Sequence, residues 1–417
     1  MPRQVRPPVL VSYVAFVLVG ISAGVSGVLL PSQMATYGVD RTTIGITFFT
    51  TSAGFVLGGL STGALIHRLG VRVALAAGGV AFVLAGLYLA TRPAFVAFVL
   101  AQLVTGYGVG VLESVLNVYL AGLPGATTQL NRLHAFWGVG ALIGPVLAAW
   151  ILGFTSWTVV WLVLALAGVP LVAAFLVAFP RTAPPARAPE ASGTSGGPAP
   201  SGLLGAALKD PGVQLGAAML AVYVGLELGV GNWGFSYLVQ ARGLSASVAG
   251  YTVSGYWLGL TLGRFLISPI AARAGATTAR MMYGCLVGVT AAAALAWVSP
   301  AAVACVALGL LGFFLGPVFP TTMAIMPELT RPGLVPTAIG VLNAASVVGG
   351  SVLPWLVGTL AQGAGMRVLL PFAVVLALAQ FVVWWPIARR LRPGSLRTGA
   401  KERERSRSSP RPGRRWR

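Results

Sequence analysis

Charged residues are scarce in this chain, and acids are the scarcest of them. Of 417 residues, 9% are charged, eight are Asp or Glu, and His and Cys occur twice each. Ordinary soluble domains carry roughly 25% charge, so the composition excludes a typical soluble protein. The few acids, histidines and cysteines form no nucleophile–base set and no metal-ligand spacing, and the chain has no Walker-type phosphate loop. We therefore expect neither an enzyme nor a bound metal or cofactor.

Long apolar segments are abundant in this chain. Hydrophobic residues make up 56% of it, and a helix that crosses a bilayer needs about 20 of them in a row. The first block is too long for a signal peptide and lacks a cleavage site. We predict an all-α membrane protein with twelve transmembrane helices, at residues 10–30, 43–66, 72–91, 94–122, 132–153, 157–179, 213–239, 245–271, 280–298, 301–327, 335–361 and 366–389.

The formal charge of +20 is unevenly placed along the chain. Half of it lies in residues 389–417, where twelve Arg or Lys accompany two Glu. A disordered basic tail beside a last membrane helix is attracted to anionic lipid headgroups. Because no folded nucleic-acid-binding domain accompanies the tail, nucleic acid is not the expected partner.

Basic residues in the short loops predict the orientation of the chain. Without the C-terminal tail, eleven Lys or Arg lie at the N-terminus or in the loops predicted on the same side of the membrane. The loops predicted on the opposite side hold four: Arg41, Arg92, Arg242 and Arg367. Lys and Arg in short loops stay on the cytoplasmic side. We predict an integral protein of the cytoplasmic (inner) membrane with both termini in the cytoplasm.

A Pro/Ala/Gly/Ser-rich segment divides the twelve spans into six and six. Asp210-Pro211 ends this segment as a helix cap followed by a first-turn proline. The expected domains are a cytoplasmic N-terminus (1–9), an N-terminal six-helix bundle (10–180), a cytoplasmic linker (181–210), a C-terminal six-helix bundle (211–390) and a basic disordered tail (391–417).

An internal repeat relates the two halves. A shift of 205 residues superposes seven glycines between windows 20–70 and 225–275, where about two coincidences are expected by chance. The outer turns also agree, since Asp40 and Ser245 each stand at a helix-capping position. Two six-helix bundles related by pseudo-two-fold symmetry resemble the plan of the major facilitator superfamily. That resemblance implies a substrate site near the bilayer midplane, between the halves.

Two loops carry the resemblance at residue level. "GALIHRLGVR" after the second span is similar to the superfamily's loop signature, with His67 standing where the family usually has an acid. The corresponding stretch after the eighth span is "GRFLISPIAARAG". The resemblance implies a gate latch at the cytoplasmic face, made of Gly63, His67, Arg68, Gly70, Arg72, Arg264 and Arg273.

A narrower resemblance is to the fucose-permease-like branch of sugar:proton symporters. "LESVLNVYLAGL" contains Glu113 and Asn117 in the Glu-x-x-x-Asn setting that serves this branch as a protonation and substrate site. The branch's second acid, in the first span, is absent, because Gly27 occupies its place. The resemblance implies sugar and proton symport.

Two acids lie deep inside predicted spans, Glu113 in the fourth and Glu227 in the seventh. A charge at the middle of a membrane helix costs about 2.5–3.5 kcal/mol on insertion scales, so each should face a cavity or a partner. We expect both to bind protons or substrate. The alternative for either residue is a structural carboxyl group hydrogen-bonded to a neighbouring helix.

Other polar groups complete the expected substrate and proton site, each with a structural alternative. A sugar could hydrogen-bond to Asn232 and stack on Trp233, although interfacial Trp anchors are as common. Imidazole titrates near neutrality, so His134 is a candidate proton relay or simply a helix-end ligand. The remaining candidates are Tyr256 and Trp257, which packing would also explain, and Asn343.

Two other functions stay open. "GALIGP" in the fifth span resembles a signature of drug:proton antiporters, so proton-driven efflux of drugs or secondary metabolites is an alternative. A membrane ligand sensor that does not transport is another. The expected partners are a small-molecule substrate, protons and lipid, and the expected state is a monomer driven by an ion gradient.

Overall fold

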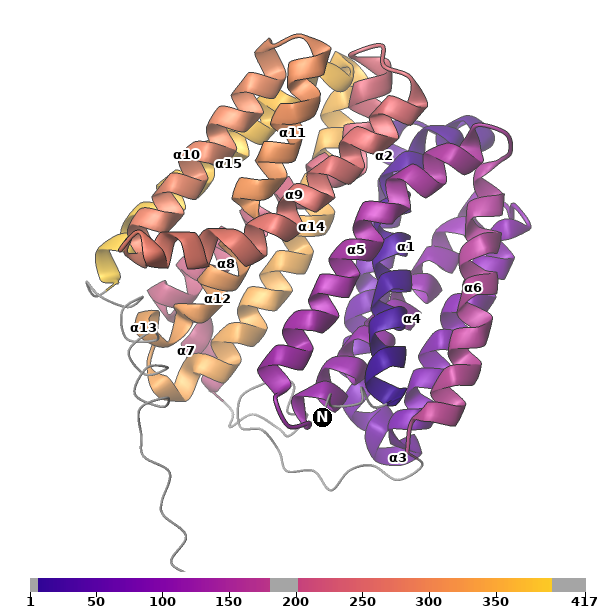
Figure 1. Cartoon of the computed structure of the whole chain (residues 1–417), viewed down its shortest axis with the longest axis horizontal. Helices are drawn as coiled ribbons and strands as arrows, with labels where there is room; N and C mark the ends of the chain where they lie inside the picture. The colour runs from indigo at the N-terminus through magenta and orange to yellow at the C-terminus, as the bar shows by residue number, and fades with distance from the viewer. Residues whose placement is uncertain (1–6, 181–201, 392–417) are drawn as a thin grey trace, which may run out of the picture.

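The computed structural model describes residues 7–180 and 202–391, which are helical except for short connections. Figure 1 shows two helical bundles side by side, one from each half of the chain. The predicted all-α membrane architecture is confirmed, and the described ranges contain no strand.

The first bundle contains six membrane crossings. A kink at Gly70 divides α3 into the second and third of them, since φ is +76° there and the helical geometry is interrupted. The helices are α1 (Pro7–Tyr37), α2 (Arg41–Ile44), α3 (Ile46–Ala90), α4 (Phe95–Ala121), α5 (Ala126–Leu152) and α6 (Trp157–Ala178).

The second bundle repeats this pattern with one broken crossing. Its tenth span is divided after α11, because Pro317 follows directly on Gly316 and α12 begins again at Val318. The helices are α7 (Leu203–Lys209), α8 (Pro211–Gln240), α9 (Ala246–Arg273), α10 (Thr278–Val298), α11 (Ala301–Leu315), α12 (Val318–Ala324), α13 (Met326–Leu329), α14 (Val335–Ala364) and α15 (Leu369–Arg390).

Among the described residues, ten helical segments are long and apolar enough to span a membrane. The twelve predicted crossings exceed this number for two reasons. Both crossings of α3 lie in one segment, Arg41–Ala90, and α9 is too polar to be among the ten although it runs the length of its bundle. The helix α7 also lies inside the range expected as linker.

The repeated glycines make equivalent helix contacts in both halves. A Cβ added at Gly54 would lie 1.9 Å from a backbone oxygen of α4, and one at Gly259 would lie 2.1 Å from a backbone oxygen of α11. Gly58 and Gly263 repeat this one turn further on, at 2.4 and 1.9 Å. Only glycine permits such backbone approach. The 205-residue repeat therefore encodes the same packing of the second span on the fourth and of the eighth on the tenth.

Helix caps behave as the sequence predicts. A side-chain oxygen of Asp40 accepts a hydrogen bond from the Thr43 amide at 2.7 Å, and the Asp210 carboxylate accepts from Gly212 and Val213 at 2.8 and 3.1 Å. These bonds satisfy amides that the first helical turn leaves unpaired. They fix the chain direction at the start of α2 and α8.

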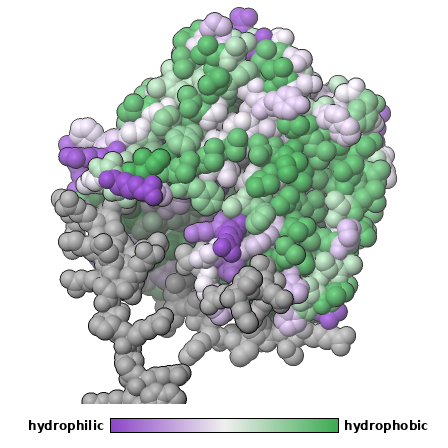
Figure 2. Space-filling view, viewed as in Figure 1, coloured by the Kyte–Doolittle hydropathy of each residue, from purple (hydrophilic) through white to green (hydrophobic). Residues whose placement is uncertain are grey.

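Each bundle has two ends, which we name by their connections. The linker face carries the end of α6, α7 and the α9–α10 connection, and the far face carries residues 38–45, 91–94 and 241–245 (Figure 1). In Figure 2, hydrophobic residues cover the flank of the first bundle, and the most hydrophilic ones lie mainly towards the ends. This distribution fits a lipid-facing flank between two aqueous ends.

The two halves are joined at the far face. Arg41 donates from Nη2 to Oε1 of Gln240 at 2.9 Å, and its backbone amide donates to Oε1 of Gln362 at 3.2 Å. Its Nη1 lies 3.4 Å from both Gln362 Oε1 and the Ala361 carbonyl oxygen. Because Arg41 belongs to the first half and its acceptors to the second, these contacts hold the far face closed.

Aromatic packing seals the layer below Arg41. The ring of Phe49 lies 5.9 Å from that of Trp355, and Phe48 lies 6.1 Å from Trp233, both edge-on. Each pair takes one ring from α3 and one from the second half. The closure at the far face is thus several side chains thick.

Candidate functional site

A cavity of about 320 Å³ lies between the two halves. That volume falls in the range of small-molecule sites. The first bundle supplies most of its wall, from α1, α3, α4, α5 and α6, and α8 and α14 close it from the second. Its polar lining residues are Ser22, Ser26, Thr51, Ser52, Gln102, Thr105, Glu113 and Ser346, together with Trp137 and Trp161.

One face of α4 forms a continuous stripe along this cavity. Gln102, Thr105, Val109 and Glu113 line it, with Gly106 between them. These positions recur at three or four residues, the spacing that places side chains on one side of a helix. A Cβ at Gly106 would lie 2.0 Å from a carbonyl oxygen of α3, so this glycine lets the two helices touch beside the cavity.

Glu113 is the only charged residue among those that line the cavity. It is part-buried, and no described residue forms an ion pair with it. Asn117 donates from Nδ2 to the backbone oxygen of Glu113 at 2.8 Å, and this bond does not involve the Glu113 carboxylate. The carboxyl group is therefore free to bind a proton or a polar solute from the cavity.

Glu227 lies in a different environment from Glu113. It is 6% exposed, and its Oε1 accepts from Nη2 of Arg264 on α9 at 3.1 Å. The Tyr256 hydroxyl donates to the backbone oxygen of Glu227 at 3.0 Å, and the hydroxyl of Tyr223 is buried on the same helix. Glu227 is not among the cavity-lining residues. The structure gives this acid a partner inside the second bundle.

Of the nine residues expected in the substrate and proton site, Glu113 alone lines the cavity. Trp233 is fully buried and donates from Nε1 to the Pro354 carbonyl oxygen at 2.8 Å. Trp257 is buried behind Trp137, with ring centroids 5.8 Å apart. The other expected residues, Asn117, Asn232, His134, Tyr256 and Asn343, also lie outside the lining.

The surroundings of these last residues differ. The backbone of Asn232 packs against Gly27, where an added Cβ would lie 2.5 Å from its oxygen. His134 is exposed and meets the edge of Phe16 at 5.6 Å. Asn343 is exposed, one turn before the lining residue Ser346. Each stands near the boundary between the halves without reaching the cavity.

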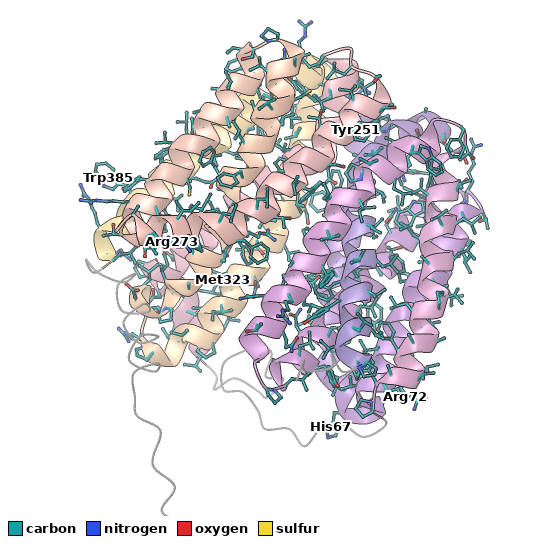
Figure 3. All side chains as sticks on the ribbon, viewed as in Figure 1. His67, Arg72, Tyr251, Arg273, Met323 and Trp385 are labelled. Atoms are coloured by element: carbon teal, nitrogen blue, oxygen red, sulfur yellow. The ribbon has the colours of Figure 1, made fainter. Side chains whose placement is uncertain are left out.

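The expected gate-latch residues are not bonded to one another within the part of the chain that the structure describes. His67 and Arg72 lie beside the kink of α3, and Arg273 lies at the end of α9, on separate bundles (Figure 3). Within the described residues, the side chains of His67, Arg68, Arg72 and Arg273 form no hydrogen bond or ion pair. Arg264 is instead engaged with Glu227. At the latch positions, no described bond joins the halves on the linker face.

Sequence reasoning missed several lining groups, of which Gln102 and Trp161 are the clearest. Gln102 is 7% exposed and Trp161 is 3% exposed. The amide of Gln102 was visible as a polar residue in the fourth span, eleven positions before Glu113. That spacing brings both onto one helix face. Trp161 gave no such signal, because an indole at the start of a span also fits interfacial anchoring.

The family follows from a match to the model of the Major Facilitator Superfamily, over residues 12–301 and 229–417. The chain belongs to the Major Facilitator Superfamily. Its two-bundle fold and its cavity between the halves agree with that membership. Membership in this family indicates a membrane transporter.

Several known proteins are similar to this chain at low sequence identity. "Bypass of stop codon protein 6" of Saccharomyces cerevisiae is 25% identical over 92% of this chain and 82% of its own length. The glucose/mannose transporter GlcP of Bacillus subtilis is 21% identical over 85% and 88%. A multidrug resistance protein B homologue of Mycobacterium tuberculosis is 28% identical, over 41% of this chain and 33% of its own.

Solved structures share the fold. A bacterial homologue of the human lysosomal transporter Spinster superposes with a TM-score of 0.75 at 12% identity, over 92% of this chain and 96% of that one. The D-xylose–proton symporter gives 0.70 at 15% identity, over 91% and 97%. The Escherichia coli fucose:proton symporter gives 0.61 at 17% identity, over 92% and 98%.

Proposed function

We propose that this protein is a proton-coupled secondary transporter, which moves a small uncharged organic solute such as a sugar across the cytoplasmic membrane by alternating access. The observation that carries the proposal is the position of Glu113. This carboxyl group lines the cavity between the halves and has no basic partner among the described residues. Family membership supports a transport function, and Glu113 is the group that could couple this transport to protons.

The charge of the cavity restricts the solute. No Lys or Arg is among its lining residues, and its one ionisable group is an acid. An anionic solute would lose its hydration without gaining a counter-ion, which is strongly unfavourable. A neutral solute avoids this cost, and hydroxyl, amide and indole groups on the wall can hydrogen-bond to it.

Protonation of Glu113 provides the coupling. An ionised carboxylate loses hydration when the halves close over it, so closure around the charged form is opposed. The protonated form carries no charge and permits closure. With the far face held by Arg41 and its acceptors, this structure represents one end of the rocking motion between the two halves.

The test uses protein reconstituted in sealed vesicles, with radiolabelled D-glucose, D-xylose and L-fucose as probes. Glu113→Gln should abolish proton-driven accumulation and leave counterflow exchange, because a permanently neutral side chain still permits closure. Glu328→Gln is the matched control, since Glu328 is an exposed acid of α13 away from the cavity. Unchanged accumulation by the Glu113 variant would reject the proposal.

Efflux of organic cations is the second candidate, and the same carboxyl group favours it. An unpaired acid in a cavity that the indole of Trp137 also lines could hold a cation by charge and cation–π attraction. A cation would compete with the proton for Glu113, so transport would be an exchange, whereas a neutral solute travels with the proton. Tetraphenylphosphonium extrusion driven by an inward proton gradient would favour efflux over solute symport.

A ligand sensor that does not transport is distinguished by the same vesicles. Such a protein would bind a probe yet show neither accumulation nor counterflow. The ion pair of Glu227 with Arg264 also bears on the coupling scheme. Because Glu227 already has a partner and lies outside the cavity lining, we assign proton coupling to Glu113 and a structural role to Glu227.

A further inference from the structure

The cavity has two chemically different ends along α4. Gln102 and Glu113 are separated by eleven residues of one uninterrupted helix, which corresponds to about 16 Å at about 1.5 Å per residue. Side chains on a helix lean towards its N-terminus, so both lean the same way and keep this separation. A single sugar ring does not span such a distance.

The end near Gln102 is polar but carries no charge. Gln102 is 7% exposed, and no described residue hydrogen-bonds to its amide. Trp161 lines the same cavity, but its Nε1 is sealed and has no hydrogen-bond partner among the described residues, so the indole presents its apolar ring. The hydroxyls of Thr51 and Ser52 lie on the α3 wall. No side-chain atom of Gln102 is among the sealed, unpartnered ones, so its amide is open to the cavity and available to a ligand.

Helix topology places these groups together near the far face. The helices α3, α4 and α6 all begin there, at Ile46, Phe95 and Trp157. Thr51, Gln102 and Trp161 come five, seven and four residues after those starts, within about two turns of the far face. Glu113 lies eight residues before the end of α4 at the linker face.

We propose that Gln102, Trp161 and the α3 hydroxyls form a separate subsite for a neutral hydrogen-bonding group of the solute, such as a sugar hydroxyl or an amide carbonyl. The Gln102 amide both donates and accepts, and the Trp161 indole offers an apolar face. The proton site at Glu113 is then distinct from the solute site. The inference rests on the proposed function and deepens it, because separate sites let proton and solute bind at the same time.

The experiment measures thermal stabilisation and binding affinity of the purified full chain with D-glucose, D-xylose, L-fucose and uridine as neutral probes. Tetraphenylphosphonium is the cationic probe. The variants are Gln102→Met, which keeps length and removes hydrogen bonding, and Trp161→Leu, which stays apolar and removes the aromatic face. Gln380→Met is the matched control, because Gln380 is also a buried amide without a partner among the described residues but lies on α15, outside the cavity.

At least one neutral probe should raise the Tm of the wild-type protein, and Gln102→Met should weaken its binding about tenfold, the loss expected for one hydrogen bond. Trp161→Leu should also weaken its binding, because the aromatic face is lost. Gln380→Met should bind that probe as tightly as wild type, and Glu113→Gln should still bind it. Stabilisation by tetraphenylphosphonium alone, by none of the neutral probes, or equal weakening in Gln380→Met would overturn the subsite.

Two results separate this inference from the proposed function. If Glu113→Gln abolishes neutral-probe binding, the solute sits at the acid and the separate subsite is refuted, while proton coupling stands. If Glu113→Gln leaves proton-driven accumulation intact but Gln102→Met abolishes binding, the subsite stands and the coupling assignment fails.

Discussion

Removing the side-chain bonds of Arg41 should open the far face. In Arg41→Met the side chain keeps its length and loses three hydrogen bonds to the second half, of which the one to Gln240 is 2.9 Å and the other two are 3.4 Å. A hydrogen bond to a charged group contributes about 1.5–3 kcal/mol, and the two long bonds add little. The closed far face should therefore become less populated, relative to the open one, by roughly 10- to 100-fold.

The assay measures maleimide labelling of a cysteine that closure buries. Ser236 is fully buried on α8, one turn beyond Asn232, whose backbone packs on Gly27 of α1. Ser236→Cys is introduced in a chain whose two native cysteines, Cys285 and Cys305, are replaced by Ala. In vesicles, Arg41→Met should raise the labelling rate of this cysteine in proportion to the open population.

The matched control for this experiment is Arg92→Met. Arg92 lies at the same face but contacts only its own half, where Nη2 lies 3.5 Å from the Thr36 carbonyl oxygen. Its loss should leave labelling unchanged. Equal labelling of the Arg41 variant and its parent, or an equal rise in the Arg92 variant, would refute a role for Arg41 in closure.

Three further predictions concern stability. Glu227→Gln should destabilise the protein by roughly 1–3 kcal/mol in thermal unfolding, since it strands Arg264, which is 29% exposed and partly screened; replacing both by Met should restore part of the loss. Gly140→Val should block folding, because a Cβ would lie 2.1 Å from the α1 backbone, whereas Gly63→Ala meets nothing within 4 Å and should be neutral by fluorescence-detected chromatography. Side-chain and backbone hydrogen bonds at the start of α2 lower the pKa of Asp40, so its stabilisation is present at neutral pH and lost as pH falls through that pKa; Asp40→Asn should flatten the acid side of the stability curve, and an unaltered curve would contradict this.

Much of the fold could be predicted because it depends on local and repeated features. Apolar blocks predicted the crossings, and glycine pairs such as Gly54 and Gly259 predicted two related halves whose equivalent contacts the structure contains. Caps at Asp40 and Asp210 were visible as residue types at helix starts. The direct junction of the second and third crossings at Gly70 was less visible, since a short basic turn there resembles an ordinary loop.

The site could be predicted only in part, because cavity lining depends on how helices rotate against each other. Glu113 was identifiable because a charge inside a membrane helix is energetically unfavourable, and this residue lines the cavity. Glu227 carried the same signal, but its neighbour Arg264 gave it a partner within the second bundle. Gln102 and Trp161 face the cavity because of tertiary packing, which the sequence of a single helix does not specify.

Infrared titration of the reconstituted protein tests the central claim most directly, because it detects protonated carboxyl groups without a known solute. Wild type, Glu113→Gln and Glu328→Gln are compared across neutral pH. The account predicts a protonated-carboxyl band that titrates in wild type and in the Glu328 variant and is missing from the Glu113 variant. Identical titration of all three proteins would show that Glu113 does not exchange protons, and would contradict the account.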